Sequence, residues 1–213
     1  MSAALTGLFT GAVLAGGLGR RMGGPKALLP GLDGRPLVVG ALEALRAAGA
    51  GPLVVVARDT LQARELGPAL IAALPDPPTI VCDRLADRGP LAGLEAALSA
   101  ATTPWSLVVA CDMPALDPAL LASIAARAVA LDAPGRPVPM AVVPRVADGV
   151  AVHPQPLHAA WSRRARPAIT AALAANRLAL RDLLRGLEVA WLDLGPSPSF
   201  IDWDAPADRP AQG

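Results

Sequence analysis

Residues 11–26 have the sequence GAVLAGGLGRRMGGPK, in which a short apolar run gives way to a cluster of glycines. The apolar run is typical of a strand with both faces buried, and the glycines after it indicate a turn. Farther along the chain, short apolar runs ending in Gly, Pro or Asp alternate with longer runs rich in Ala and Leu. This alternation is typical of βαβ units and predicts an α/β fold, with a largely parallel sheet and helices on both of its faces.

The expected elements follow from the same alternation. The predicted strands are the short apolar runs at Gly11–Ala15, Leu53–Ala57, Thr79–Asp83, Ser106–Cys111, Met140–Val143 and Glu188–Leu194. The predicted helices are the longer runs at Leu37–Ala48, Thr60–Leu74, Leu91–Ala101, Pro118–Leu131 and Pro167–Ala175, with a shorter one near Leu180–Leu184. Proline at or near the start of two of these helices fits the first turn, where a backbone N–H has no acceptor within the helix.

Size and charge narrow the classes of function. The chain has 213 residues, which is close to one domain of ordinary size. Lys and Arg number 19 against 18 Asp and Glu, so the formal charge of +1 gives no overall field toward nucleic acid or an anionic membrane. Aromatic residues make up only 3%, which suits close packing of helices on a sheet better than a surface for stacking bases. Any anionic ligand must therefore be bound by a local site.

The start of the chain and its cysteines bear on location. The stretch from Met1 to Gly19 carries no formal charge, but it has no basic start, is interrupted by glycines and runs directly into Arg20. We therefore expect no signal peptide and no membrane span, and a cytoplasmic location. Cys82 and Cys111 are far apart, and neither has a second Cys or a His at zinc-ligand spacing. We expect neither a disulfide framework nor a structural zinc site.

The glycine-rich turn after the first strand is the first candidate for chemistry. Its glycines let backbone N–H groups approach and cradle phosphate oxygens, and Arg20, Arg21 and Lys26 add positive charge for a polyphosphate. A P-loop would need Gly-Lys-Ser/Thr, which is absent here, and the dinucleotide fingerprint would need Gly where Met22 stands. A strand-to-helix turn with exposed basic residues is the competing interpretation.

Two carboxylates follow predicted strands. Asp112 follows the predicted strand Ser106–Cys111, and ligands of an open parallel sheet bind beyond the carboxyl ends of its strands. At that place a Mg²⁺ ion would bridge the carboxylate of Asp112 to nucleotide phosphates. Alternatively, Asp112 caps the following turn, and we expect the adjacent Cys111 to be a small buried hydrophobe. Asp83 ends another strand, and Gly89 and Gly93 after it would let the chain pass close to a ligand. A charged surface loop is the alternative for that segment.

The remaining candidates lie in the C-terminal half. Asp202 and Asp204 alternate with apolar residues, so in an extended segment both carboxylates face the same side and would contribute to a metal site. Two solvated carboxylates are the competing interpretation. His153 and His158 lie in a proline-rich stretch that we expect to be a surface loop. A Ser/His/Asp triad is unsupported, because the chain has no Gly-x-Ser-x-Gly motif.

Taken together and in this order, these segments resemble the molybdenum cofactor guanylyltransferase family over nearly the whole chain. The similar segments are Leu14-Ala15-Gly16-Gly17 with Arg21-Met22-Gly23 and Lys26, resembling the signature loop; Gly89-Pro90-Leu91-Ala92-Gly93, resembling the guanine-side loop; and Cys111-Asp112-Met113-Pro114, resembling the metal-binding turn. The looser C-terminal similarities are His153-Pro154 and Pro156-Leu157 in the pterin-side region, Arg181 in a late helix, and Phe200 to Asp208 at the closing motif.

The resemblance implies a nucleotide-diphospho-sugar transferase-like, Rossmann-like fold, a single three-layer α/β/α domain with a mostly parallel sheet. It would cover residues 1–207, with a nucleotide-binding half at about 9–115 and an acceptor-binding half at about 116–207, followed by a flexible tail at 208–213. The implied activity is Mg²⁺-dependent transfer of GMP from GTP to the phosphate of molybdopterin or Mo-molybdopterin, with release of pyrophosphate. Chaperones on the molybdoenzyme side are further implied partners, whereas nucleic acid and membranes are not.

The resemblance also implies roles for single residues. The backbone of Leu14, Ala15, Gly16 and Gly17 binds the nucleotide in this interpretation, and Lys26 and Arg21 bind its phosphates. Asp112 binds Mg²⁺, with Asp202 and Asp204 as candidate additional ligands. Asp83 binds guanosine, through either the base or the ribose, since a carboxylate accepts hydrogen bonds from both.

The chain departs from the family at two places. Ala57 stands where the family often has Asn after the second strand, which leaves that polar contact missing or supplied by Arg58 or Asp59. Asp202 and Asp204 replace the closing asparagines, where added negative charge should favour a cation and repel pyrophosphate. The alternatives are a related transferase that uses CTP or another phosphorylated acceptor, a nicotinamide-binding domain, and a nucleotide-binding protein without catalytic activity. Gly16-Gly17 favours guanine over the cytosine of related cytidylyltransferases.

Overall fold

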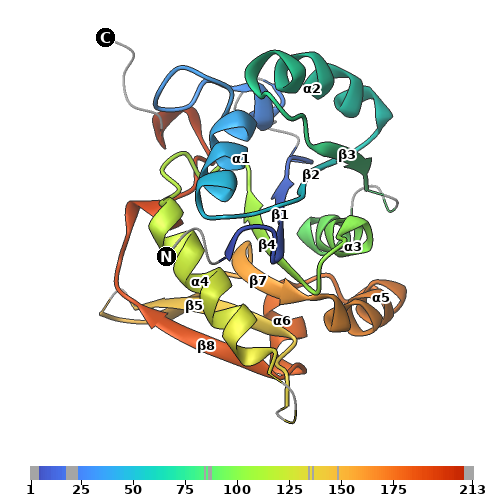
Figure 1. The fold of residues 1–213 in the computed structure, drawn as a ribbon, viewed down its shortest axis with the longest axis vertical. Helices are drawn as coiled ribbons and strands as arrows, with labels where there is room; N and C mark the ends of the chain where they lie inside the picture. Colours follow the sequence, from blue (N-terminus) through green and yellow to red (C-terminus); the bar gives the residue numbers. More distant parts are fainter. Residues whose placement is uncertain are drawn as a thin grey trace.

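The computed structural model describes residues 5–17, 24–83, 85, 88–133, 135, 137–147 and 149–208. Within these residues, one sheet of eight strands has the order β3-β2-β1-β4-β7-β5-β6, and β8 pairs with β5 (Figure 1). The strands are β1 (Phe9–Leu14), β2 (Leu53–Ala57), β3 (Thr79–Cys82), β4 (Trp105–Ala110), β5 (Ala141–Ala147), β6 (Val152–Pro154), β7 (His158–Ser162) and β8 (Val189–Leu194). The helices are α1 (Leu37–Ala47), α2 (Thr60–Ala73), α3 (Pro90–Ala100), α4 (Pro118–Leu131), α5 (Arg166–Ala174) and α6 (Leu180–Arg185), with short 3-10 turns η2 (Lys26–Leu28), η3 (Arg163–Ala165), η4 (Pro198–Phe200) and η5 (Pro206–Asp208).

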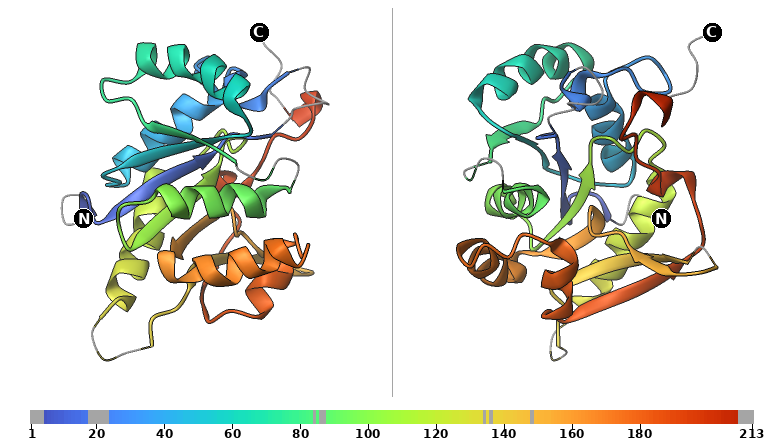
Figure 2. Two further views of the ribbon diagram at one scale, coloured as in Figure 1. Left: turned by 90° about the vertical axis from the view of Figure 1, so that its right-hand side faces the viewer. Right: turned by 180° about the vertical axis from the view of Figure 1, so that it is seen from behind.

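The predicted three-layer arrangement is confirmed. β1 lies inside the parallel core of the sheet, paired in parallel with β2 and with β4. Its side chains alternate between two hydrophobic cores, with Phe9 and Val13 in one and Ala12 and Leu14 in the other. Helices α1, α2 and α4 fill the first core, and α3, α5 and α6 fill the second, so helices cover both faces of the sheet (Figure 2).

Small residues allow α1 to pack closely on β1. A Cβ atom at Gly11 would lie 2.8 Å from Cδ2 of Leu53 and about as close to the Cβ atoms of Ala50 and Leu45, at 3.0 and 3.1 Å. A contact of 2.8 Å would force the Leu53 side chain to shift, and contacts of 3.0 and 3.1 Å are unusually tight, so a larger residue at this position would require its neighbours to move. Glycine at position 11, which begins the predicted first strand, therefore favours the close approach of α1 and of the segment that leads into β2.

The stretch after β5 differs from the prediction. His153 and His158 do not lie in a surface loop, because β6 and β7 form there and both pair antiparallel with β5. β7 also pairs antiparallel with β4, so it lies between the two halves of the sheet and all five of its residues are buried. The flanking prolines suggested a loop, but Pro154 belongs to the three-residue strand β6 at the sheet edge, where proline is tolerated.

The other predicted strands and helices occur, and their ends agree to within two residues except at β5, which continues to Ala147. Asp208, predicted to begin a flexible tail, belongs to η5, and its carboxylate accepts hydrogen bonds from the N–H groups of Asp204 and Ala205. Residues 209–213 of that predicted tail lie outside the described residues. In the described part of the chain, every helix is too short or too polar to cross a membrane.

Candidate nucleotide site

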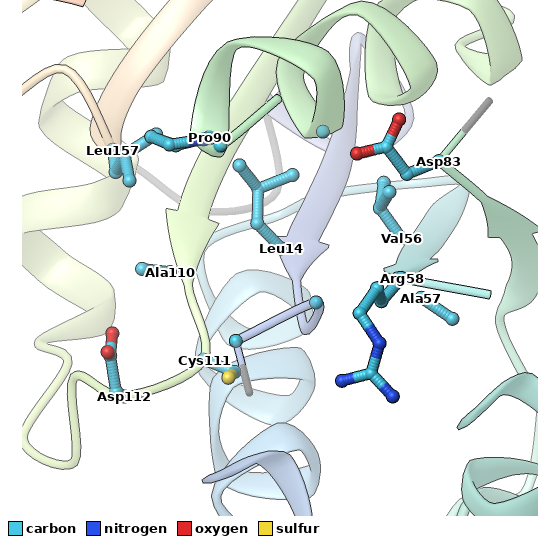
Figure 3. A pocket seen from close by; sticks show the side chains of 14 residues that line it. Leu14, Val56, Ala57, Arg58, Asp83, Pro90, Ala110, Cys111, Asp112 and Leu157 are labelled. Atoms are coloured by element: carbon cyan, nitrogen blue, oxygen red, sulfur yellow. The ribbon is translucent and has the colours of Figure 1, made fainter. Parts of the chain in front are cut away.

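A cavity of about 390 Å³ opens where the parallel strands end. Leu14 of β1, Ala57 of β2 and Ala110 of β4 line it, and Pro90 at the start of α3 closes one side (Figure 3). The carboxyl edge of a parallel sheet is the place where open α/β folds bind ligands. The three strand-end segments singled out in the sequence, and the C-terminal segment with Asp202 and Asp204, therefore have to be placed relative to this cavity.

The backbone that follows β1 forms one wall. Leu14, Gly16 and Gly17 line the cavity, and Ala15 is fully buried beneath them. The N–H of Ala15 donates to the carbonyl of Val56 at 2.9 Å, which continues the β1–β2 pairing beyond the end of the strand. The predicted nucleotide loop thus reaches the cavity. Arg20 and Arg21, its predicted phosphate-binding arginines, lie outside the described residues.

Lys26, at the start of η2, lies between two carboxylates. Its Nζ donates to Oδ2 of Asp112 at 2.8 Å and to Oδ1 of Asp204 at 2.6 Å. Burial works against the charge on Lys26, but hydrogen bonds and attraction from both carboxylates outweigh it and raise the pKa of Lys26 above its usual value. Lys26 therefore remains charged at neutral pH, and it joins segments from the start, middle and end of the chain.

Asp112 occupies the position predicted for it, directly after β4 and in the lining of the cavity. Within the described residues its carboxylate accepts from Lys26 and from no backbone N–H of the turn, so the capping alternative is wrong. Its backbone carbonyl accepts the N–H of Trp203 at 2.9 Å, and Trp203 is buried. This contact brings the C-terminal segment, with Asp202 and Asp204 on either side of Trp203, against the Asp112 turn.

Asp112, Asp202 and Asp204 do not form a complete metal site by themselves, but they suit a site in which a nucleotide supplies some of the ligands. Among the described residues, no group of three or more acidic, histidine or cysteine side chains is arranged to hold a metal ion. Burial, followed by the charges of Asp204 and Asp112, nevertheless raises the pKa of Asp202, so negative charge is crowded here. Carboxylate oxygens suit Mg²⁺, which usually takes one or two protein carboxylates and completes its coordination with phosphates and water. The donor set fits that ion if the nucleotide supplies the remaining ligands.

Asp83 and Arg58 lie on the other side of Leu14 from Asp112 in the view of Figure 3. Asp83 follows β3, and its Oδ1 accepts the N–H of Leu85 at 2.8 Å. Burial raises the pKa of Asp83, and the charge of Glu95 adds to the effect. Arg58 and Asp59 are the two residues expected to replace the polar contact missing at Ala57. Arg58 lines the cavity, whereas Asp59 caps α2.

The residues of the C-terminal half that the resemblance implies for the acceptor line different hollows of the surface. His153 lines a separate hollow of about 420 Å³ with Phe200, and Arg181 lines another with Trp191. Leu157 is the residue of this group that reaches the first cavity. His158 is fully buried and lies 4.7 Å, between ring centroids, from Phe200.

Cys111 is a buried structural residue. It is 3% exposed, and burial raises the pKa of its thiol to about 12. A thiol that stays protonated at neutral pH is a poor nucleophile. The expectation that Cys111 packs as a small hydrophobe is confirmed, although the residue also borders the cavity.

Known proteins are similar to this chain in sequence and in fold. Residues 11–191 match a family described as the MobA-like NTP transferase domain. The chain is 32% identical over 201 residues to a probable molybdenum cofactor guanylyltransferase of Methanothermobacter thermautotrophicus, covering 92% of this chain and 95% of the relative. It is 37% identical over 182 residues to a molybdenum cofactor guanylyltransferase of Burkholderia ambifaria, covering 85% and 83%. The crystal structure of molybdopterin-guanine dinucleotide biosynthesis protein A from Archaeoglobus fulgidus is similar with a TM-score of 0.73 at 25% identity, covering 94% of each chain.

Proposed function

Since the chain belongs to the family of MobA-like NTP transferase domains and is a nucleotidyltransferase, we propose that it transfers GMP from GTP to the phosphate of molybdopterin. The observation that carries this proposal is one cavity with a glycine backbone wall, Asp83 on one side and Asp112, paired with Lys26, on the other. A base would occupy the Asp83 side, and the phosphates would extend toward Asp112.

Guanine fits the polar groups on the base side. Its N1–H and N2–H₂ donate to an acceptor such as the carboxylate of Asp83, whereas its O6 and N7 accept from a donor such as the guanidinium of Arg58. Arg58 donates from Nε to Asp59 at 2.9 Å, and within the described residues its Nη groups have no acceptor. Adenine and cytosine do not offer this combination of edges.

The negative charge of the phosphates would be balanced by Lys26, by Arg21 and by a Mg²⁺ ion held at Asp112. Lys26 would exchange one of its carboxylate partners for phosphate oxygens, and Arg21 would add a second cation. Asp112 would hold Mg²⁺, which supplies Lewis-acid stabilisation of phosphate charge when bound. The N–H groups of the glycine loop would donate to the nucleotide from the opposite wall.

The reaction is an in-line displacement. An oxygen of the molybdopterin phosphate forms a bond to the α-phosphorus of GTP, while the bond from that phosphorus to the bridging oxygen of the β-phosphate breaks. Pyrophosphate leaves with the electron pair, and no covalent enzyme intermediate is required. The side chains act by positioning and by balancing charge, as in phosphoryl transfer generally. On the acceptor side, Leu157 from the C-terminal half of the chain lines the cavity and would contact the nucleotide or the acceptor there.

The test is to incubate the protein with Mg²⁺ and each of the four NTPs, with and without molybdopterin, and to measure pyrophosphate and the mass of the product. We expect pyrophosphate from GTP only when molybdopterin is present. A preference for CTP would overturn the guanylyl assignment, and transfer to a different phosphorylated acceptor would overturn the molybdopterin assignment. An absence of pyrophosphate from every NTP would overturn nucleotidyl transfer to molybdopterin.

A further inference from the structure

Gln62, in the first turn of α2, is a buried polar side chain that the proposed function has not used. It has no exposed surface, and both ends of its amide are hydrogen-bonded. Its Nε2 donates to the carbonyl of Ala15 at 2.8 Å, and its Oε1 accepts the N–H of Arg58 at 2.7 Å. A buried amide is costly unless it is bonded in this way, so the two contacts hold the side chain in one orientation.

Helix capping explains only part of this geometry. Asp59 is the N-cap of α2, and its Oδ1 accepts the N–H of Gln62 at 2.8 Å. In a capping box, the side chain at this third helical position bonds back to the N–H of the cap itself. Oε1 of Gln62 instead accepts the N–H of Arg58, one residue before the cap, and its Nε2 donates to the carbonyl of Ala15 in the nucleotide loop. The cap does not require that second bond.

The bond to Ala15 sets the direction of the next N–H group. In a trans peptide the C=O of one residue and the N–H of the following residue point in opposite directions, and the described residues contain no cis peptide bond. With the Ala15 carbonyl held toward Gln62, the Gly16 N–H points away from α2. Gly16 lines the cavity, and within the described residues its N–H donates to no acceptor.

We propose that Gln62 is a positioning residue that orients the Ala15–Gly16 peptide, so that the Gly16 N–H faces the cavity and donates to an oxygen of the bound nucleotide. The inference rests on the proposed function. The N–H of Ala15, in the preceding peptide, donates to the carbonyl of Val56, so Ala15 is held through both its N–H and its C=O. The same amide also holds the backbone of Arg58, against which Gly16 packs, since a Cβ at Gly16 would lie 3.5 Å from Cα of Arg58.

Steady-state kinetics of two variants test this role. Gln62→Met keeps the length of the side chain and removes both bonds, and Gln62→Glu keeps an acceptor for Arg58 but sets a carboxylate oxygen against the Ala15 carbonyl. For both we expect the KM for GTP to rise about tenfold with kcat within about twofold, as when a binding contact shared by ground and transition states is lost. A rise in KM no larger than that of the control would overturn the proposal.

The matched control is Thr10→Val at the opposite end of β1. Thr10 is also fully buried, and its Oγ1 lies 2.7 Å from Oγ1 of Thr103. This variant should lose stability, as the Gln62 variants do, but leave the KM for GTP unchanged. A merely structural role for Gln62 would make all three variants alike.

A measurement on the unaltered protein separates this inference from the proposed function and does not depend on the folding of any variant. In protein labelled with ¹⁵N-glycine, the Gly16 amide signal should shift when Mg²⁺ and GTP are added. If GTP is turned over but the Gly16 signal is unmoved, the positioning role is wrong and the function stands. If another NTP moves Gly16 while no GMP is transferred, the function is wrong and the positioning role stands. If no NTP moves Gly16, the positioning role is wrong whatever the activity.

Discussion

Replacing Asp83 with Asn should erode the preference for GTP over CTP more than it lowers the maximal rate. Asn keeps the shape of the side chain but exchanges one acceptor oxygen for a donor group. Guanine would then present its N1–H and N2–H₂ to a side chain that no longer accepts from both. CTP makes no such contact, because cytosine lacks this pair of donors.

The size of the effect follows from the contacts of Asp83. Its Oδ1 already accepts the N–H of Leu85 at 2.8 Å, so Oδ2 is the oxygen left for the base. A hydrogen bond to a charged group contributes about 1.5–3 kcal/mol, or roughly 10- to 150-fold in kcat/KM for GTP. We expect the unaltered protein to prefer GTP over CTP by at least ~10²-fold and Asp83→Asn to lose most of that ratio. Since burial and then Glu95 raise the pKa of Asp83, mild acid should reduce the preference by protonating it at a higher pH than an ordinary aspartate.

The assay is a competition between GTP and CTP for transfer by each protein, with both products quantified. Asp33→Asn is the matched control, because Asp33 is an exposed carboxylate paired with Arg35 outside the cavity, and it should leave the ratio intact. Equal weakening of all four nucleotides by Asp83→Asn would show that Asp83 holds the ribose. Unchanged kinetics would remove Asp83 from the nucleotide site.

Three further outcomes are expected. Lys26→Ala should weaken GTP binding and turnover together, because the ammonium touches the polyphosphate in ground and transition states alike; unchanged values of both would exclude it from the phosphate site. Asp112→Ala should cut turnover by roughly 10²-fold while circular dichroism shows an intact fold, because the backbone carbonyl of Asp112, and not its side chain, holds Trp203. Burial lowers the pKa of His158 to about 4, so between about pH 6.5 and 4 the unfolded chain binds a proton at this histidine that the folded chain does not. The free energy of unfolding should therefore fall as the pH drops through that window, by up to roughly 3 kcal/mol. Urea unfolding across this range should show that loss, and His158→Leu should flatten it.

The parallel core of the sheet and the edge that binds ligand could be predicted from the sequence. Runs of apolar residues that end in Gly or Asp mark strands buried on both faces, and parallel strands bring their carboxyl ends to one edge. That rule alone places Gly16, Asp83 and Asp112 around one cavity. A signal for Gln62 was also present, since Asp59 followed three residues later by Gln resembles a capping box. What the pattern could not indicate is that the amide reaches the backbone just after β1.

β7 could not be predicted for a physical reason. It is five residues long and buried throughout, with His158 at its start and prolines just before it, so it shows neither alternation nor an aliphatic run. Its place is determined by long-range pairing, antiparallel to β4 and β5. Tertiary pairing of this kind overrides local preference, and it also buries a histidine whose sequence context is that of a surface loop.

The pairing of Lys26 with Asp204 resolves a difficulty that the sequence alone raises. The resemblance seen in the sequence implies an amide at position 204, so the carboxylate of Asp204 adds negative charge near the place expected for pyrophosphate. The two residues are 178 positions apart, and no periodicity fixes where an irregular C-terminal segment will lie. In the structure, the carboxylate of Asp204 accepts a hydrogen bond from Nζ of Lys26 at 2.6 Å, and this ion pair offsets its charge. The side chain of Asp204 is 65% exposed, so water and salt screen the remaining charge. The substitution is therefore compatible with a phosphate site, because the lysine that would bind the phosphates also neutralises the added carboxylate.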